Sequence, residues 1–164
     1  MALISSASSS FTRRWKYDVF LSFKGEVTRY NFTDYLYNAL MQKGIYTFRD
    51  DKKLDRGTII MLELLKAIEE SRFAVVILST DYASSRWCLI ELTKIVECME
   101  KRGLVILPVF YHVDPSDVRN QRGSFAKYLS KHEKRLNNNI GKVQMWKAAL
   151  IKVANLAGWD LKIK

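Results

Sequence analysis

The sequence contains few cysteines, few glycines and no long apolar run. Its two cysteines, Cys88 and Cys98, lie in apolar patterns and not at metal-ligand spacing, which favours two buried, reduced thiols over a metal site. No run approaches the roughly 18 apolar residues that a transmembrane helix needs. The seven glycines are too widely spaced for a GxGxxG or GxxxxGK[ST] loop. Rossmann dehydrogenases and P-loop NTPases are therefore excluded.

Two further enzyme classes lack the side chains that they need. No GxSxG elbow occurs, and His112 and His132 have no nucleophile and acid in a recognisable triad arrangement. A phospho-receiver needs clustered acids after the first strand, where this chain has Ser22, Phe23 and Lys24. The sequence therefore disfavours a serine hydrolase and a receiver domain.

The length and charge of the chain limit its organisation and its partners. The 164 residues fit one domain, which we assign to residues 15–160, preceded by a flexible serine-rich segment at 1–14. The net charge of +10 is compatible with an anionic partner. The basic residues are scattered and form no block of five, so a solvated basic surface is favoured over a nucleic-acid site.

Short apolar runs rich in β-branched and aromatic residues predict strands that are buried on both faces. These runs are Tyr17 to Phe23, Phe73 to Leu78 and Leu104 to Tyr111, with a weaker one at Ile45 to Phe48. A fifth strand is expected between about Lys131 and Gly141, or just before the last helix. Strands alternating with helices predict an α/β fold, a flavodoxin-like three-layer sandwich with a five-stranded parallel sheet.

Between the predicted strands, apolar residues recur at helical spacing. In the first helix, Thr28 to Lys43, they form one face, and Asp114 followed by Pro115 predicts the start of a short helix. Ser124 is expected to cap a further helix. The predicted apolar faces comprise Phe32, Tyr35, Leu36, Ala39 and Leu40; Met61, Leu64, Leu65 and Ile68; Cys88, Leu92, Ile95, Val96 and Met99; and Val143, Trp146, Leu150, Val153 and Ala157.

A ligand site is expected where the strand order reverses, at the carboxyl ends of the first and third strands. The loops that meet there begin at Lys24, Arg49 and Ser79. Glu91 precedes Leu92 and is rotated about 100° from the buried stripe of its helix, which places a carboxylate near this crevice. Considered alone, Glu91 could instead complement the helix dipole.

Five ordered blocks of this sequence resemble the Toll/interleukin-receptor (TIR) domains of plants: YDVFLSFKGEVTRYNFTDYLYNAL, IYTFRDDKKLDRG, LLKAIEESR, DYASSRWCLIEL and PVFYHVDPSDVRNQRGSFAKY. The resemblance implies a self-associating domain of a cytoplasmic, or also nuclear, disease-resistance receptor that signals in defence and cell death. In many plant members the domain cleaves NAD+ to nicotinamide and ADP-ribose-type products.

The resemblance also implies roles for individual residues. Glu91 matches the catalytic glutamate of the family, and NAD+ or NADP+ is the implied substrate, with no tightly bound cofactor and no metal. The implied partners are further copies of the chain and other TIR-containing immune proteins. The residues expected to contact the nucleotide are Lys24, Gly25, Arg56, Ser85 and Trp87.

Some positions depart from the family pattern and favour a rival function. Lys24 replaces an arginine, Val27 a common acid, Ile90 an often polar residue, and Tyr35 a histidine at one of the family's packing interfaces. The rival is a non-catalytic module that signals by homotypic assembly alone. Nucleic-acid binding, a third class, has only the net charge in its favour.

Overall fold

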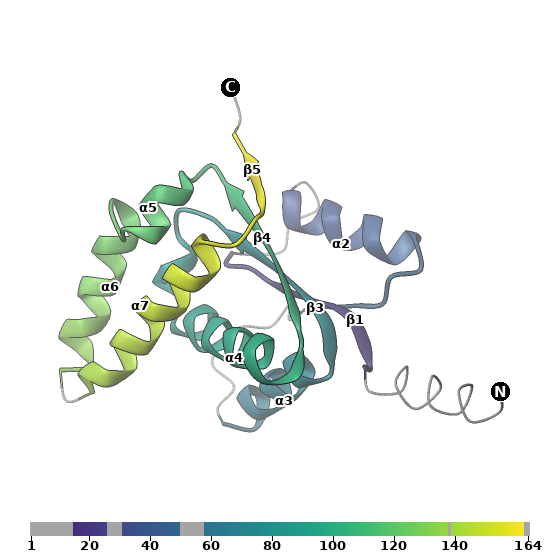
Figure 1. Cartoon of the computed structure of the whole chain (residues 1–164), viewed down its shortest axis with the longest axis horizontal. Coiled ribbons are helices and arrows are strands. Elements are labelled where there is room, and N and C mark those ends of the chain that lie inside the picture. Colours follow the sequence, from purple (N-terminus) through teal and green to yellow (C-terminus); the bar gives the residue numbers. More distant parts are fainter. Residues whose placement is uncertain (1–14, 26–30, 50–57, 138, 163–164) are drawn as a thin grey trace.

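The protein, described by a computed structural model over residues 15–25, 31–49, 58–137 and 139–162, is built on one parallel sheet (Figure 1). The sheet has the order β2-β1-β3-β4-β5, so the order reverses between β1 and β3. This confirms the predicted flavodoxin-like α/β sandwich. The strands are β1 (Tyr17–Ser22), β2 (Thr47–Arg49), β3 (Ser71–Leu78), β4 (Val105–Tyr111) and β5 (Trp159–Leu161).

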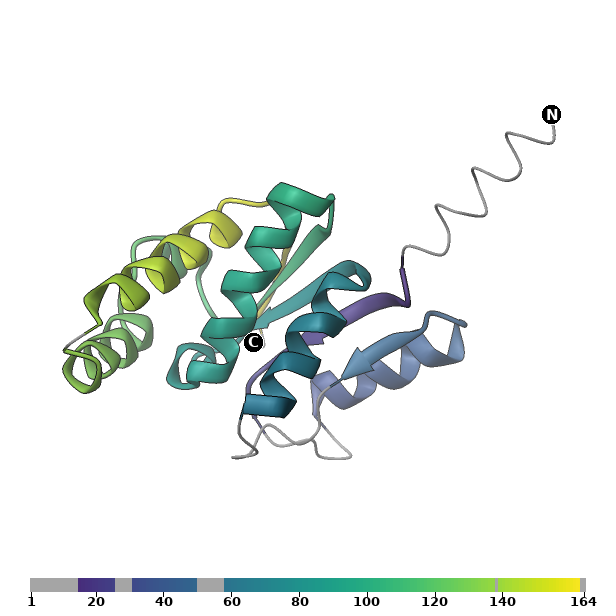
Figure 2. The same ribbon diagram turned by 90° about the horizontal axis from the view of Figure 1, so that it is seen from below.

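Helices cover the two faces of the sheet unequally (Figures 1 and 2). One face carries α2 (Phe32–Gln42). Opposite it, α3 (Thr58–Glu69) and α4 (Arg86–Arg102) lie on the sheet, while α7 (Ile140–Ala154) packs against α4. The remaining elements are the 3-10 turn η1 (Tyr82–Ser84), α5 (Pro115–Arg119) and α6 (Ser124–Arg135). No helix within the described ranges is long and apolar enough to cross a bilayer.

The alternation of side chains along β1 sends its residues into two separate cores. Val19 and Leu21 join the core under α2, and Phe20 joins the larger core under α3 and α4. By the same alternation Ser22 faces α4, which places a hydroxyl group in a largely apolar layer. Both cysteines are buried, as predicted.

The face under α2 is the less covered one. Phe32, Leu36 and Leu40 lie against β3 and β4, and an apolar groove remains between α2 and the sheet, which Trp159 and Leu161 also line. Tyr35 was predicted to share the buried face, and this is wrong, because its side chain is 72% exposed. Along α2, Thr33 is buried, whereas Phe32, Leu36 and Leu40 are partly buried.

The fifth strand does not lie where the sequence predicted it. Residues 131–135 continue α6, and β5 follows α7 at Trp159–Leu161, in register with Val109 to Tyr111 of β4. Three residues are too few to show an alternating pattern. The turn into β5 needs Gly158, because a Cβ atom there would lie 2.3 Å from the carbonyl oxygen of Pro108.

The predicted helix starts agree with the structure at one of two sites. Asp114 caps α5, accepting a hydrogen bond from the backbone N–H of Ser116 at 2.9 Å. Ser124 does not cap α6, because it is the first helical residue and Gly123 occupies the cap without a side-chain bond. The last helix also ends before Ala157, which is exposed.

His132 of α6 is a buried structural residue that contacts η1 and α7. Its Nε2 lies 2.8 Å from the carbonyl oxygen of Ala83, and its ring meets Trp146 edge-on at 5.4 Å between centroids. Nδ1 has no hydrogen-bond partner among the described residues. Burial lowers the pKa of His132, although the hydrogen bond to Ala83 acts in the opposite direction. Protonation would bury an unsatisfied N–H, so the folded chain favours the neutral ring.

The stability of the protein should therefore fall as the pH drops below about 6.5, the ordinary histidine pKa. The unfolded chain binds a proton on His132 more readily than the folded chain, so stability rises with pH through this window. We expect the melting temperature of His132→Gln to depend less on pH between 7.5 and 5 than that of the wild type, because the amide does not titrate. The amide can still donate a hydrogen bond to Ala83, so the fold should be retained. His112→Asn, at an exposed position, should keep the wild-type slope. An unchanged slope in His132→Gln would contradict the assignment.

Candidate functional site

The edge at which β1 and β3 end is where the predicted site residues meet. Lys24 and Gly25 follow β1 after one intervening residue, Phe23, and Lys24 is partly buried while Gly25 is exposed. Gly25 has a φ of +121°, and a Cβ atom at this position would meet no other atom within 4 Å. Glycine is therefore required here by the backbone conformation rather than by crowding.

The loop after β3 is held in place by its own hydroxyl groups. Ser79 donates to the carboxylate of Asp81 at 2.7 Å, and Ser84 donates to the carbonyl oxygen of Asp81 at 2.6 Å. The backbone N–H of Tyr82 donates to the carbonyl oxygen of Ser79 at 3.1 Å. These bonds fix η1 and turn the side chain of Tyr82 into the protein, where it is completely buried.

Glu91 is completely buried, at 0% exposure, beneath the end of β1. The prediction that Glu91 lies near the crevice agrees with this position, whereas the prediction that it lies off the buried stripe is wrong. Glu91 lies about one helical turn from Cys88 and from Ile95, on the face of α4 that packs against β1, so the buried face is wider than the predicted stripe. A glutamate with a purely dipolar role would remain in contact with solvent.

A short chain of hydrogen bonds links Glu91 to β1 and η1. The hydroxyl of Ser22 donates to Oε1 of Glu91 at 3.0 Å, and the Tyr82 hydroxyl lies 2.8 Å from Ser22 Oγ. The Tyr82 hydroxyl also donates to the carbonyl oxygen of Cys88 at 3.2 Å, and the Cys88 thiol donates to the carbonyl oxygen of Phe23 at 3.3 Å. These contacts join the first turns of α4 to the end of β1.

The Tyr82 hydroxyl stays protonated within this network. Its pKa is raised well above the ordinary value, first by burial and then by the charges of Cys88 and Glu91, while the bond to Ser22 acts in the opposite direction. A protonated phenol can donate a hydrogen bond to Ser22, which in turn donates to Glu91. Sequence analysis missed Ser22 and Tyr82 as site residues, although Ser22 stands out as a hydroxyl group inside an apolar run.

Two further predicted site residues, Ser85 and Trp87, lie at the start of α4. Ser85 is the N-cap, and its hydroxyl accepts a hydrogen bond from the backbone N–H of Cys88 at 3.3 Å. Trp87 is partly exposed on the first turn, and Ile90 packs against the core, which accounts for an apolar residue there. Arg56 and Val27 lie outside the described residues.

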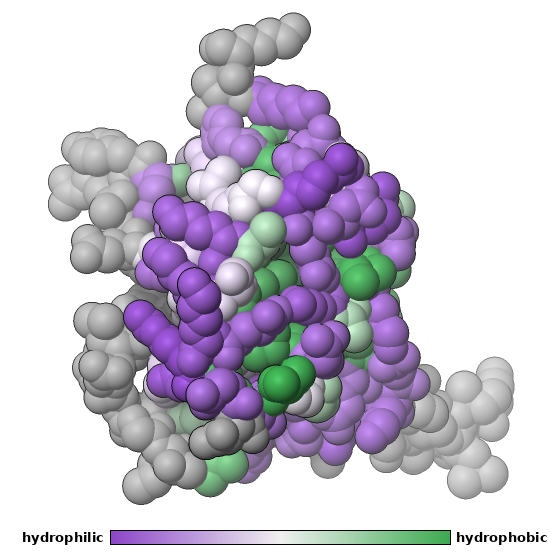
Figure 3. Space-filling view, turned by 90° about the vertical axis from the view of Figure 1, so that its left-hand side faces the viewer, coloured by the Kyte–Doolittle hydropathy of each residue, from purple (hydrophilic) through white to green (hydrophobic). Residues whose placement is uncertain are grey.

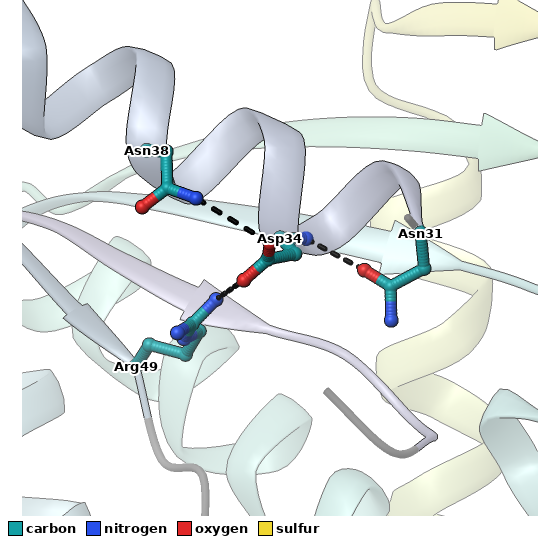
Figure 4. A network of polar contacts seen from close by, with 4 residues as sticks. All are labelled: Asn31, Asp34, Asn38 and Arg49. Atoms are coloured by element: carbon teal, nitrogen blue, oxygen red, sulfur yellow. Dashed lines mark hydrogen bonds and ion pairs between the residues drawn. The ribbon is translucent and has the colours of Figure 1, made fainter. Parts of the chain in front are cut away.

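A second polar network lies beside this edge, between α2 and the end of β2 (Figure 4). Arg49 forms an ion pair with Asp34 at 3.0 Å, and its guanidinium lies 3.9 Å from the centroid of the Tyr37 ring. Asp34 also accepts from Asn38 at 3.4 Å, and its backbone N–H donates to Asn31 at 2.7 Å. Figure 4 shows Arg49 pointing from β2 towards Asp34, so the network fixes the start of α2 to β2.

The side formed by α5, α6 and α7 is largely hydrophilic, interrupted by separate apolar patches (Figure 3). Ile140 and Met145 are the most exposed large apolar residues of α7. Two shallow grooves run between α4 and α7, and Met145 lines both. Lys24, Gly25, Ser85 and Trp87, the described residues that were predicted to bind the nucleotide, do not line these grooves or the groove beside α2.

Comparison with known proteins gives consistent matches over most of the chain. The family model of the TIR domain matches residues 16–164. TMV resistance protein N of Nicotiana glutinosa is 55% identical over 93% of this chain and 13% of that protein, and disease resistance protein RPV1 of Vitis rotundifolia is 55% identical over 96% and 11%. The TIR domains in the structure of the activated Roq1 resistosome recognising the pathogen effector XopQ superpose with a TM-score of 0.79 at 57% identity, covering 89% of this chain and 88% of that one.

These matches cover the TIR domain and only a small part of the longer curated proteins. The chain spans only 13% and 11% of the length of the two curated relatives. The similarity to the Roq1 TIR domains nevertheless covers nearly all of both chains. The chain belongs to the TIR-domain family and is closely related to plant disease-resistance proteins.

Proposed function

We propose that this chain is an NAD+ nucleosidase that acts after self-association and signals in plant defence and cell death. The observation that carries the proposal is the position of Glu91, a buried carboxylate held by a hydrogen bond where the strand order reverses. A buried ionisable group at such a crevice, with a defined partner, is a candidate for catalysis. Membership of the TIR family supports the same assignment.

The proposed reaction breaks the bond between C1′ of the ribose and the nicotinamide nitrogen. The departing nicotinamide takes the bonding electron pair and becomes neutral, which leaves positive charge on the ribose ring. A fixed carboxylate stabilises such an oxocarbenium-like state, as in glycoside hydrolysis. Water then adds to C1′ and loses a proton, giving an ADP-ribose-type product. Glu91 would provide the negative charge and orient the water.

The neighbouring residues would bind the nucleotide. Trp87 offers an indole face for a planar ring. Ser85 adds a hydroxyl group at the start of α4, where the helix dipole favours anions. Lys24 and Arg56 would contribute positive charge for the phosphates, with Arg56 able to bind them in a bidentate way. NADP+ is an alternative substrate with the same scissile bond.

Self-association is part of the proposal because Glu91 is inaccessible in a single chain. A substrate reaches a carboxylate of 0% exposure only after the surrounding side chains move. Contacts between copies can supply the free energy for such a change. The relative in the Roq1 resistosome supports assembly of this kind. Tyr35, at 72% exposure on α2, is available to a second copy or to another TIR-containing immune protein.

The alternative is a non-catalytic interaction module of a disease-resistance receptor. It is favoured by the complete burial of Glu91 and by Lys24 and Tyr35, which depart from the family pattern. In this case assembly itself would be the signal, and no substrate would be consumed.

The two functions differ in one measurement. Purified protein at increasing concentration is incubated with NAD+, nicotinamide is followed by chromatography, and light scattering records the size of the particles. The nucleosidase proposal expects nicotinamide release per chain to rise together with particle size. Assembly without nicotinamide release, with both NAD+ and NADP+, would favour the interaction module.

A further inference from the structure

The hydroxyl groups of Tyr82 and Ser22 form a chain of hydrogen bonds that ends at the carboxylate of Glu91. Ser22 is fully buried at the last position of β1, Tyr82 is fully buried on η1, and neither is among the residues expected to contact the nucleotide. Two segments distant in sequence, β1 and the consecutive η1 and α4, therefore meet in this cluster. A buried polar cluster of this kind fixes one arrangement when its members satisfy one another.

The direction of the hydrogen bonds follows from the chemistry of the groups. The Ser22 hydroxyl donates to Oε1 of Glu91 across 3.0 Å, where the carboxyl oxygen is the acceptor. The Ser22 oxygen can then accept from Tyr82, which lies 2.8 Å away, closer than the 3.2 Å to the carbonyl oxygen of Cys88. Burial keeps the pKa of Tyr82 high, so the phenol retains the proton that it donates.

We propose that Ser22 and Tyr82 are positioning residues for the reaction: Ser22 fixes the orientation of the Glu91 carboxylate, and Tyr82 fixes the hydroxyl of Ser22. This inference rests on the proposed nucleosidase activity. A displacement of about 1 Å at a catalytic group can lower the rate about a hundredfold. The cluster acts on the chemical step and not on nucleotide binding, because its hydroxyl groups act through the Glu91 carboxylate.

The test measures kcat and KM for nicotinamide release in Ser22→Ala, Tyr82→Phe and the double variant. We expect Ser22→Ala to lower kcat about ten- to a hundredfold, with KM within about threefold of the wild type. Tyr82→Phe should lower kcat less, by about three- to tenfold, since Ser22 keeps its own bond to Glu91. In the Ser22→Ala background Tyr82→Phe should have no further effect, because it acts through Ser22.

Ser71→Ala is the matched control. Ser71 is a fully buried serine at the opposite end of the sheet, and its hydroxyl donates to the carbonyl oxygen of Ala67 at 2.7 Å. Its kcat should equal that of the wild type. If Ser22→Ala does not fold, as judged by thermal unfolding, Tyr82→Phe, which removes a single oxygen atom, carries the test.

Each outcome decides the inference. An active wild type with an unchanged or raised kcat in Ser22→Ala would overturn the positioning role while leaving the proposed function intact. If the decreases in kcat of the two single variants add up in the double variant, Tyr82 does not act through Ser22, and that part of the inference is overturned. A wild type that releases no nicotinamide when assembled would overturn the proposed function and this inference together.

Discussion

Glu91→Ala is expected to lower nicotinamide release from NAD+ by about a hundredfold to a thousandfold. This is the typical effect of removing one electrostatic stabiliser of a charged transition state. The loss should appear in kcat, because the carboxylate acts on charge that develops only as the nicotinamide leaves. Chromatography of the reaction at a fixed protein concentration measures it.

Glu91→Gln removes the negative charge of the side chain but keeps its size and shape. The amide oxygen of glutamine can still accept the hydrogen bond of Ser22, so the fold and the assembly should be retained while the negative charge is lost. Both variants are therefore expected to be inactive, with a wild-type melting temperature for the glutamine variant. Activity within threefold of the wild type in folded Glu91→Gln would remove Glu91 from the mechanism.

The largest effect on stability is expected from Trp146→Ala. Trp146 is 2% exposed on α7 and packs against His132 between two layers of helices. Truncating a buried tryptophan costs about 3–5 kcal/mol of unfolding free energy. Because small domains are stable by about 5–15 kcal/mol, the variant should be close to unfolding at 37 °C. Urea denaturation followed by far-UV circular dichroism measures the change.

Trp159 provides the comparison within the same chain. It lies on β5 at 54% exposure, so Trp159→Ala should cost about 1 kcal/mol or less. Equal losses for the two tryptophans would mean that β5 contributes to the core as much as α7 does, contrary to the burial of their side chains.

The fold was predictable from sequence wherever long buried runs define an element. Both faces of β1, β3 and β4 are covered, so these strands read as continuous apolar runs, and their order followed from the alternation with helices. β5 escaped prediction because three edge residues, two of them exposed, carry no period. Tyr35 was wrongly predicted to be buried because it is an aromatic residue at helical spacing beside the apolar stripe. The sequence does not show how wide the covered face of α2 is.

The site was predictable only in part. The resemblance identified Glu91 and the residues at the start of α4, and the structure places Glu91 beneath the edge where the strand order reverses. Its complete burial could not be foreseen, because glutamate is ordinarily exposed and only the fold brings Ser22 of β1 within hydrogen-bond distance of it. Ser22 and Tyr82 were missed because they are 60 residues apart in sequence, and only the fold brings their hydroxyl groups together.

The central claim is that this domain cleaves NAD+ through Glu91. The most direct measurement follows NAD+ and nicotinamide together in concentrated wild-type protein and in Glu91→Gln at the same concentration and particle size. The account predicts that the wild type loses one NAD+ for each nicotinamide formed, while Glu91→Gln leaves NAD+ intact. Intact NAD+ in both samples, or equal cleavage in both, would contradict it.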